Sequence, residues 1–242
     1  MLQEKDIRTG LLLGQEGVHN LKNATVLVAG CGAVGGFALE ALARAGIGHL
    51  IIVDFDVFDE TNLNRQLFAT TKTLGQSKTT AVKERLLIIN PDLKITEKSV
   101  KISTETMDFI FDETPDFAID AIDSVTAKSF LIEELLKREI PFISAMGAAL
   151  KTDLSKIKIA SFHKTIECPL AAFVRKRLRQ RGVSLKFPVV FSSECVSDKR
   201  ALADEADEKT GRRAMGSLVT VTGIFGLMCA HEAILYLIRK TK

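Results

Sequence analysis

Residues 25–56 constrain the fold of this chain more than any other stretch, because two apolar runs in it are joined by a glycine-rich turn and a helix-forming run. The first apolar run, 25–29, leads directly into a turn that carries Gly30, Gly32 and Gly35. The second run ends at Asp54. A strand, a tight turn, a helix and a second strand in this order predict one unit of a parallel sheet.

The turn and the acid that follows it have the chemistry of a nucleotide site. Glycines let the backbone approach phosphate oxygens, and the N–H groups at the start of the new helix supply partial positive charge. Asp54 falls at the end of the second strand, where its carboxylate can accept hydrogen bonds from a ribose hydroxyl. This pattern suits NAD or FAD as well as ATP, and glycines that only tighten helix–strand packing are the structural alternative.

The rest of the first 150 residues continues the alternation of strands and helices. The pattern predicts strands at 93–96, 116–122 and 141–145 and helices at 79–90, 104–111 and 125–139. Ser77 is the expected N-cap of the helix at 79–90. We therefore predict an α/β fold with a doubly wound, mostly parallel sheet of the Rossmann-like type.

The character of the chain changes after Gly147, and the added elements are predicted to be antiparallel. We expect an amphipathic strand at 156–162, a helix at 169–181, a strand at 187–191, a charged loop at 198–213 and a terminal helix at 216–239. A single domain over 1–242 is predicted, with a nucleotide-binding core at 1–150 and a substrate-binding and dimer-supporting part at 151–242.

Composition limits the compartment and the partners. A net charge of +3 on 242 residues gives no global signature of nucleic-acid binding, so such a partner must be found in local clusters. The four cysteines are far apart and form no Cys-x-x-Cys pair, which argues against zinc and disulfides and favours a cytoplasmic setting. The apolar segment 218–230 is shorter than the roughly 18 to 20 residues of a membrane span. A buried helix is favoured there, and loose membrane association stays open.

Charged and amide side chains gather where the predicted strands end. They are Asp54, Asp56, Asn62, Arg65, Gln66, Lys78, Asp120 and Asp123. Such a set suits attack of a carboxylate on an α-phosphate more than hydride transfer, because Arg65 and Lys78 could neutralise the leaving pyrophosphate. Asp123 could hold magnesium between phosphate oxygens. Each residue alone is also compatible with a surface charge network.

The order and spacing of these motifs resemble those of the ubiquitin-activating-enzyme-like adenylyltransferases. The resemblance covers residues 8–147 and implies that Asp54 binds the ATP ribose, with Asp56 in the same ATP site. It implies an ATP site that also contains the glycines of the turn, Asn62, Arg65, Gln66 and Lys78, with Mg²⁺ bound by Asp123. Arg8 resembles the family arginine that reaches into the ATP site of the partner subunit, which implies a homodimer.

The second half resembles one branch of that superfamily, the tRNA threonylcarbamoyladenosine dehydratases. The matching segments are 164–166, 169–172, 175–181 and 191–194. These enzymes use ATP to activate the carboxylate of the threonylcarbamoyl group on a tRNA adenosine, which cyclises with release of AMP. The resemblance implies tRNA as partner, a monovalent cation (Na⁺ or K⁺) as a further cofactor, and sometimes a sulfur-relay protein.

A basic run on the predicted helix 169–181 is the candidate tRNA contact. Its cations, with one that precedes it, are Lys164, Arg175, Lys176, Arg177, Arg179 and Arg181. They could bind phosphates without reading sequence, or they could form a solvated helix face. With one tyrosine and no tryptophan in the chain, base recognition has no evident residue.

Three other functions remain open on the sequence. An adenylyltransferase for the C-terminal carboxylate of a small sulfur-carrier or ubiquitin-like protein would use the same half-reaction, but the zinc site usual in that group has no cysteine pairs here. A nicotinamide-dependent oxidoreductase would have no use for Arg65 and Lys78. A non-catalytic scaffold would be expected to lack one of the reactive positions, and Asp123 is also present.

Overall fold

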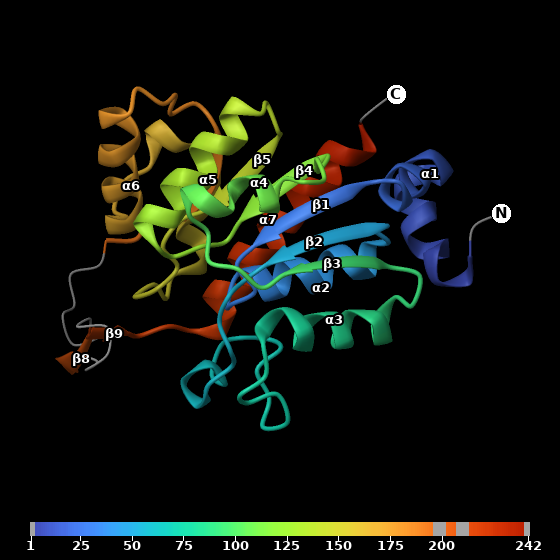
Figure 1. The fold of residues 1–242 in the computed structure, drawn as a ribbon, viewed down its shortest axis with the longest axis horizontal. Helices are drawn as coiled ribbons and strands as arrows, with labels where there is room; N and C mark the ends of the chain where they lie inside the picture. Colours follow the sequence, from blue (N-terminus) through green and yellow to red (C-terminus); the bar gives the residue numbers. More distant parts are fainter. Residues whose placement is uncertain (1–2, 196–201, 207–212, 240–242) are drawn as a thin grey trace.

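The protein forms a doubly wound α/β fold around one large sheet (Figure 1). The computed structural model describes residues 3–195, 202–206 and 213–239. Its main sheet has the strand order β3-β2-β1-β4-β5-β7-β6, in which β6 is antiparallel to β7 and all other neighbours are parallel. The predicted fold class is therefore confirmed.

The strands lie close to where the sequence predicts them. They are β1 Thr25–Ala29, β2 His49–Val53, β3 Lys94–Lys98, β4 Phe117–Asp120, β5 Phe142–Ala145, β6 Ile157–Ser161 and β7 Pro188–Ser192. The helices are α1 Ile7–Lys22, α2 Gly35–Ala45, α3 Lys78–Ile89, α4 Met107–Ile110, α5 Val125–Lys137, α6 Pro169–Gln180 and α7 Val219–Ile238. Short 3₁₀ turns include Glu60–Asn62 and Phe162–Lys164.

Two hydrophobic layers cover the two faces of the sheet. Along β1, Val26 and Val28 belong to a cluster with α1, α2, α3 and α7, whereas Leu27 and Ala29 belong to a cluster with α4, α5 and α6. Successive side chains of a strand point to opposite faces, so a strand buried on both sides must be apolar throughout. This is why the run at 25–29 shows no polar alternation.

Helix α7 is a core helix of the first layer. It is the one helix in the described chain that is long and apolar enough to cross a membrane, and half of its most apolar window is buried. A Cβ at Gly226 would lie 2.2 Å from the carbonyl oxygen of Val34, so α7 approaches the start of α2 at backbone distance. This packing supports the prediction of a buried helix.

The prediction of a loop at 198–213 is wrong for the residues that the structure describes. Strands β8 Leu202–Ala206 and β9 Arg213–Met215 form an antiparallel pair, in which Leu202 lies opposite Met215. The rest of that run lies outside the described residues. Pairing between positions 7 to 13 residues apart creates these strands, and a charged run without alternation gives no local indication of it.

Candidate nucleotide-binding site

The glycine turn between β1 and α2 brings backbone segments closer together than side chains would permit. Gly30 has a φ of +94°, and a Cβ at Gly35 would lie 1.7 Å from the carbonyl oxygen of Gly30. No side chain caps the first turn of α2, whose N-cap is Val34. The N–H of Gly36 donates to the carbonyl of Gly32, and the N–H groups of this helix start that are not bonded within the turn can meet an anion at the carboxyl edge of the sheet.

Asp54 is held beside this turn by two backbone donors. Its Oδ2 accepts a hydrogen bond from the N–H of Cys31 at 2.7 Å, and its Oδ1 accepts one from the N–H of Asp56 at 2.9 Å. Burial raises the pKa of Asp54, although these two N–H groups and the nearby Lys78 ammonium oppose the shift. The carboxylate is fixed in orientation and retains acceptor capacity for hydroxyl donors.

Lys78 starts α3 and lies in the same site. Its side chain is buried, and its ammonium lies 3.1 Å from Oδ2 of Asp56. A lysine in the first turn of a helix opposes the helix dipole, which predicts an anionic partner, and in this structure the partner is Asp56. Ser77 occupies the expected N-cap position, but its hydroxyl contacts Oγ1 of Thr79 and caps no backbone N–H.

The segment between β2 and α3 carries three of the predicted residues, Asn62, Arg65 and Gln66. Asn62 is buried, and its amide pairs with Asp59 in a reciprocal cap of the Glu60–Asn62 turn. Arg65 donates to the carbonyl of Thr61 at 2.7 Å and is half-exposed, so its guanidinium can turn toward a ligand.

Gln66 contributes an unpaired buried acceptor. Its Oε1 has no hydrogen-bond partner among the described residues, and its amide lies 3.7 to 3.8 Å from the position that a Cβ of Gly32 would take. Buried acceptors are normally paired, so this amide fits a ligand that donates to it at the glycine turn.

Asp123 follows β4 on the opposite side of the turn. The carbonyl of Ala121 lies 2.8 Å from the position of a Cβ on Gly30, so residues 121–123 run directly beside the glycines. Asp123 is exposed. The described residues contain no group of three His, Cys, Asp or Glu side chains that could hold a metal. One carboxylate beside a phosphate site is the donor set of a Mg²⁺ ion bound mainly by phosphates and water.

Asp120, which the sequence pattern grouped with these acids, does not belong to the open site. It is fully buried under the end of β4, where its Oδ2 lies 2.7 Å from the ammonium of Lys128 and accepts a hydrogen bond from Ser144 at 2.6 Å. Its Oδ1 accepts the N–H of Ile122 at 3.2 Å. Its Oδ2 is thus engaged by Lys128 and Ser144, and its Oδ1 orients the turn that carries Asp123.

Sequence reasoning missed Lys128 and Ser144. Lys128 lies on the apolar face of α5, together with Ala127, Leu131 and Ile132, all of them buried. A single lysine on an otherwise apolar helix face indicates a buried ion pair, and this pattern could have identified it.

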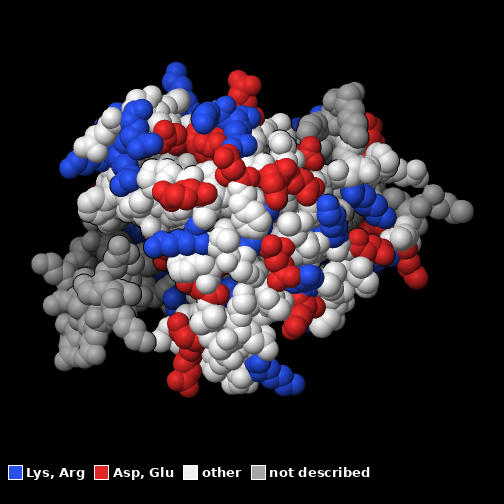
Figure 2. Space-filling view, in the orientation of Figure 1, with Lys and Arg blue, Asp and Glu red and all other residues white. Residues whose placement is uncertain are grey.

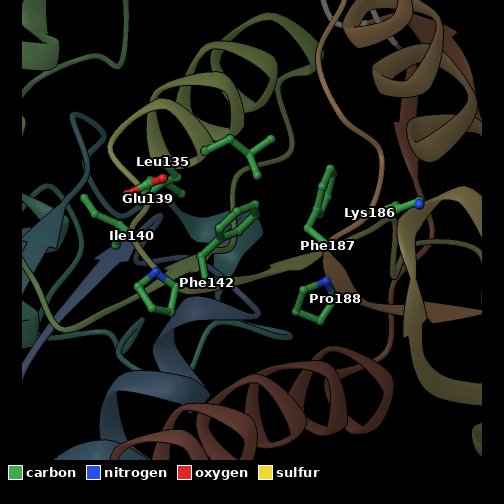
Figure 3. A pocket seen from close by; sticks show the side chains of 9 residues that line it. Leu135, Glu139, Ile140, Phe142, Lys186, Phe187 and Pro188 are labelled. Atoms are coloured by element: carbon green, nitrogen blue, oxygen red, sulfur yellow. The ribbon is translucent and has the colours of Figure 1, made fainter. Parts of the chain in front are cut away.

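The structure does not bring Arg8 into the site of its own chain. Arg8 lies on α1 before β1, and the chain enters β1 from the amino edge of the sheet, opposite Asp54 (Figure 1). A shallow pocket of about 260 Å³ also lies at that edge, at the starts of β5 and β7, between Phe142 and Phe187 (Figure 3). It is remote from the glycine turn.

The basic residues of α6 divide into two groups. The Arg175 guanidinium donates to the carbonyl and hydroxyl of Thr165, Arg181 forms an ion pair with Glu133 at 2.5 Å, and Arg177 contacts Thr126 at 3.4 Å. These three arginines fasten α6 to its neighbours. In the part of the chain that is described, Lys164, Lys176 and Arg179 form no ion pair or hydrogen bond with a side chain, and they remain available.

A glycine turn, a fixed acid and paired cations at the carboxyl edge of a doubly wound sheet define a nucleotide-binding protein. The sequence pattern of the ThiF family matches residues 5–242. The chain is 40% identical to the tRNA threonylcarbamoyladenosine dehydratase of Bacillus subtilis, over 96% of this chain and 94% of the relative. It is 32% identical to the enzyme of that name from Escherichia coli, over 93% and 90%.

Solved structures give the same result. A crystal structure of the E. coli tRNA N6-threonylcarbamoyladenosine dehydratase in complex with ATP superposes with a TM-score of 0.88 at 29% identity, covering 98% of this chain and 94% of that one. The complex of that protein with AMP gives 0.87 at 30% identity, over 96% and 93%. The chain belongs to the ThiF family, and within it to the tRNA threonylcarbamoyladenosine dehydratases.

Proposed function

We propose that this protein catalyses the ATP-dependent dehydration of threonylcarbamoyladenosine in tRNA, through adenylation of the threonylcarbamoyl carboxylate. The observation that carries the proposal is the glycine turn with Asp54 and Lys78 around it, in a chain that matches the dehydratases over almost its whole length. The relatives' complexes with ATP and AMP support the adenylation step.

The first step joins the substrate carboxylate to AMP. Asp54 accepts the ribose hydroxyls, and the N–H groups at the start of α2 contact the phosphates. The carboxylate oxygen attacks the α-phosphorus, the bond to the β-phosphate oxygen breaks, and pyrophosphate leaves. Lys78 and Arg65 neutralise the developing charge, and Lys78 exchanges Asp56 for a phosphate oxygen as it does so.

The second step closes the ring. An atom of the threonylcarbamoyl group attacks the activated acyl carbon, the bond to the AMP oxygen breaks, and a proton is lost from the nucleophile. The net result is the removal of one water from the modified nucleoside, with its oxygen carried away on AMP. Because the carboxyl oxygen leaves as part of AMP, it does not have to leave as hydroxide.

Two cations complete the proposal. Mg²⁺ would be held by Asp123 with phosphate oxygens, and its chemistry is to shield the triphosphate charge. Na⁺ or K⁺ is the second proposed cation, near residues 164–181. The carbonyls of Glu167 and Glu194 converge there but already accept hydrogen bonds from the buried ammonium of Lys151, so an ion could bind them only by displacing that ammonium. Equal rates in Na⁺, K⁺ and a large organic cation would assign this position to Lys151 alone.

A homodimer is the proposed assembly. Helix α1 exposes Leu11 and Leu12 at 83% and 84%, together with Ile7, and Arg8 lies on the same helix. A second copy would cover this apolar surface and could accept Arg8 into its site. Light scattering should give twice the chain mass, and Leu11→Glu should lower it.

A sulfur-relay protein stays only a predicted partner. Burial or a neighbouring carboxylate raises the pKa of the thiols of Cys31, Cys195 and Cys229, and this disfavours the thiolate that sulfur transfer would use.

The proposed compartment is the cytoplasm, where tRNA is modified.

The alternative substrate, a small sulfur-carrier protein, has less support. The molybdopterin-synthase adenylyltransferase of Salmonella typhimurium is 31% identical but matches 63% of this chain and 60% of its own length.

Mass spectrometry of digested tRNA tests the proposal. The purified protein is incubated with ATP, magnesium and tRNA that carries threonylcarbamoyladenosine, and the nucleosides are then weighed. The expected result is the loss of one water from the modified nucleoside, dependent on ATP and accompanied by AMP. No change in mass, with ATP still bound, would refute tRNA as the substrate and leave a protein carboxylate as the acceptor.

A further inference from the structure

Helix α6 exposes one aromatic side chain that its packing does not use. Its apolar residues Ala171, Val174 and Leu178 are buried against the sheet, but Phe173 is 62% exposed. Lys176 follows three positions later and is also exposed, so it lies on the same side of the helix one turn on. An aromatic ring and a cation therefore stand next to each other on the outer face of α6.

Contacts between helices orient α6 relative to α5 and so indicate the direction in which Phe173 lies. Arg177, one turn after Phe173, contacts Thr126 in the first turn of α5, and Arg181 pairs with Glu133 further along α5. The two helices thus run in the same direction, and the first turns of α6 extend past the start of α5. The start of α5 follows Asp123 closely, so the first turns of α6, which carry Phe173, lie toward the edge of the sheet at which Asp123 lies.

The charge around Phe173 selects the kind of partner. Lys164, Lys176 and Arg179 have no ion-pair partner in the described chain, and Lys and Arg side chains gather over the end of the molecule where α6 lies (Figure 2). Ile166 is the other large apolar side chain exposed near the start of α6. Unpaired cations on the same surface segment as an exposed ring are typical of sites that bind single-stranded nucleic acid, with phosphates on the cations and a base on the ring.

We propose that Phe173 is a stacking platform for a tRNA base at or next to the modified adenosine. The proposal rests on the proposed function and adds to it the residue that reads the RNA. A nucleoside must leave its neighbours' stack before an enzyme can act on it, and a ring at the rim of the site replaces the lost stacking. Composition could not single out this ring, because the chain has 14 phenylalanines and only the structure shows which of them are exposed.

The absence of tryptophan from the sequence makes a direct test available. Phe173→Trp places a single fluorophore at the proposed platform, and Ile88→Trp places one at an exposed position of α3, on the opposite face of the sheet. Substrate tRNA should quench Phe173→Trp strongly and leave Ile88→Trp unchanged. Wild-type protein is assayed in parallel for ATP-dependent loss of water from the nucleoside.

Two further variants separate stacking from simple apolar contact. Phe173→Ala and Phe173→Leu should each weaken tRNA binding by about 10- to 100-fold, and Phe173→Trp should bind as the wild type does. ATP binding and chain mass in light scattering should stay unchanged in all three.

Each other outcome overturns the proposal. If Phe173→Ala bound tRNA with wild-type affinity, or if the Ile88→Trp control were quenched equally, the stacking role of Phe173 would be refuted. A positive dehydration assay of the wild type would leave the proposed function intact in that case. Wild-type affinity of Phe173→Leu would exclude stacking, and a lower mass of Phe173→Ala would assign the ring to a second copy of the chain. Failure of the wild-type dehydration assay would instead refute the proposed function.

Discussion

Replacing Lys128 with methionine should destabilise the fold by about 3–5 kcal/mol, because it leaves the charge of Asp120 buried without its partner. In the wild-type protein the ammonium lies 2.7 Å from Asp120, 3.2 Å from the Ser144 hydroxyl and 2.9 Å from the carbonyl of Ala145. Both charged side chains are 0% exposed, so water cannot take over these bonds. Methionine has a similar length, and the expected loss is therefore electrostatic and not due to a cavity.

A double variant isolates that charge. Lys128→Met with Asp120→Asn removes both charges, and the loss should shrink to about 1–2 kcal/mol, the contribution of the remaining hydrogen bonds. Lys137→Met on the same helix is the matched control, since Lys137 is 75% exposed, and it should stay within about 0.5 kcal/mol of the wild type.

Equilibrium unfolding in urea at one fixed protein concentration measures these differences. ATP affinity should fall with stability in the single variant, because Asp120 also accepts the N–H of Ile122 in the turn that presents Asp123. A loss below about 1 kcal/mol for Lys128→Met, or a double variant no more stable than the single one, would contradict the uncompensated-charge argument.

Three further outcomes are expected. Arg65→Ala should lower ATP-dependent turnover by about 10²–10³-fold with little change in melting temperature, because its contacts are to an exposed turn; near-normal AMP release would remove its phosphate role. Lys176→Gln with Arg179→Gln should reduce the slope of log tRNA affinity against log salt by about 2 without changing ATP affinity, and an unchanged slope would mark both as solvated charges. Burial raises the pKa of Glu194, but the N–H donors of Asp153 and Thr152 outweigh it, and the net pKa lies below the usual value of a glutamate. Glu194→Gln should therefore be less stable than the wild type at pH 7, and the difference should vanish as pH falls through the lowered pKa; a difference that persists in acid would contradict this.

Local patterns predicted most of the fold. The run at 25–29 and the helix after the glycine turn were found because each carries its own periodicity, apolar throughout for a strand buried on both faces and helix-forming before Gly46. The parallel order followed from the alternation of elements. The hairpin of β8 and β9 was missed because it depends on pairing between segments that show no alternation.

The candidate site was predictable in its residue types and less so in their partners. Asp120 and Asp123 look alike in sequence, and the difference between them arises from Lys128 and Ser144, which reach Asp120 from α5 and β5. Arg175 and Lys176 are neighbours in one basic run, yet the helix turns the first toward Thr165 and the second toward solvent. Composition cannot separate them, because the separation is set by which face of α6 is buried.

The two layers of helices that cover the sheet carry different exposed surfaces. The exposed apolar residues of α1 lie in the layer of α2, α3 and α7, whereas Phe173 and the unpaired cations of α6 lie in the other layer. A second copy that covers the apolar residues of α1 would therefore use a different layer of helices from the one that carries the α6 surface. The binding stoichiometry that this geometry favours is one tRNA for each chain, and two for a dimer.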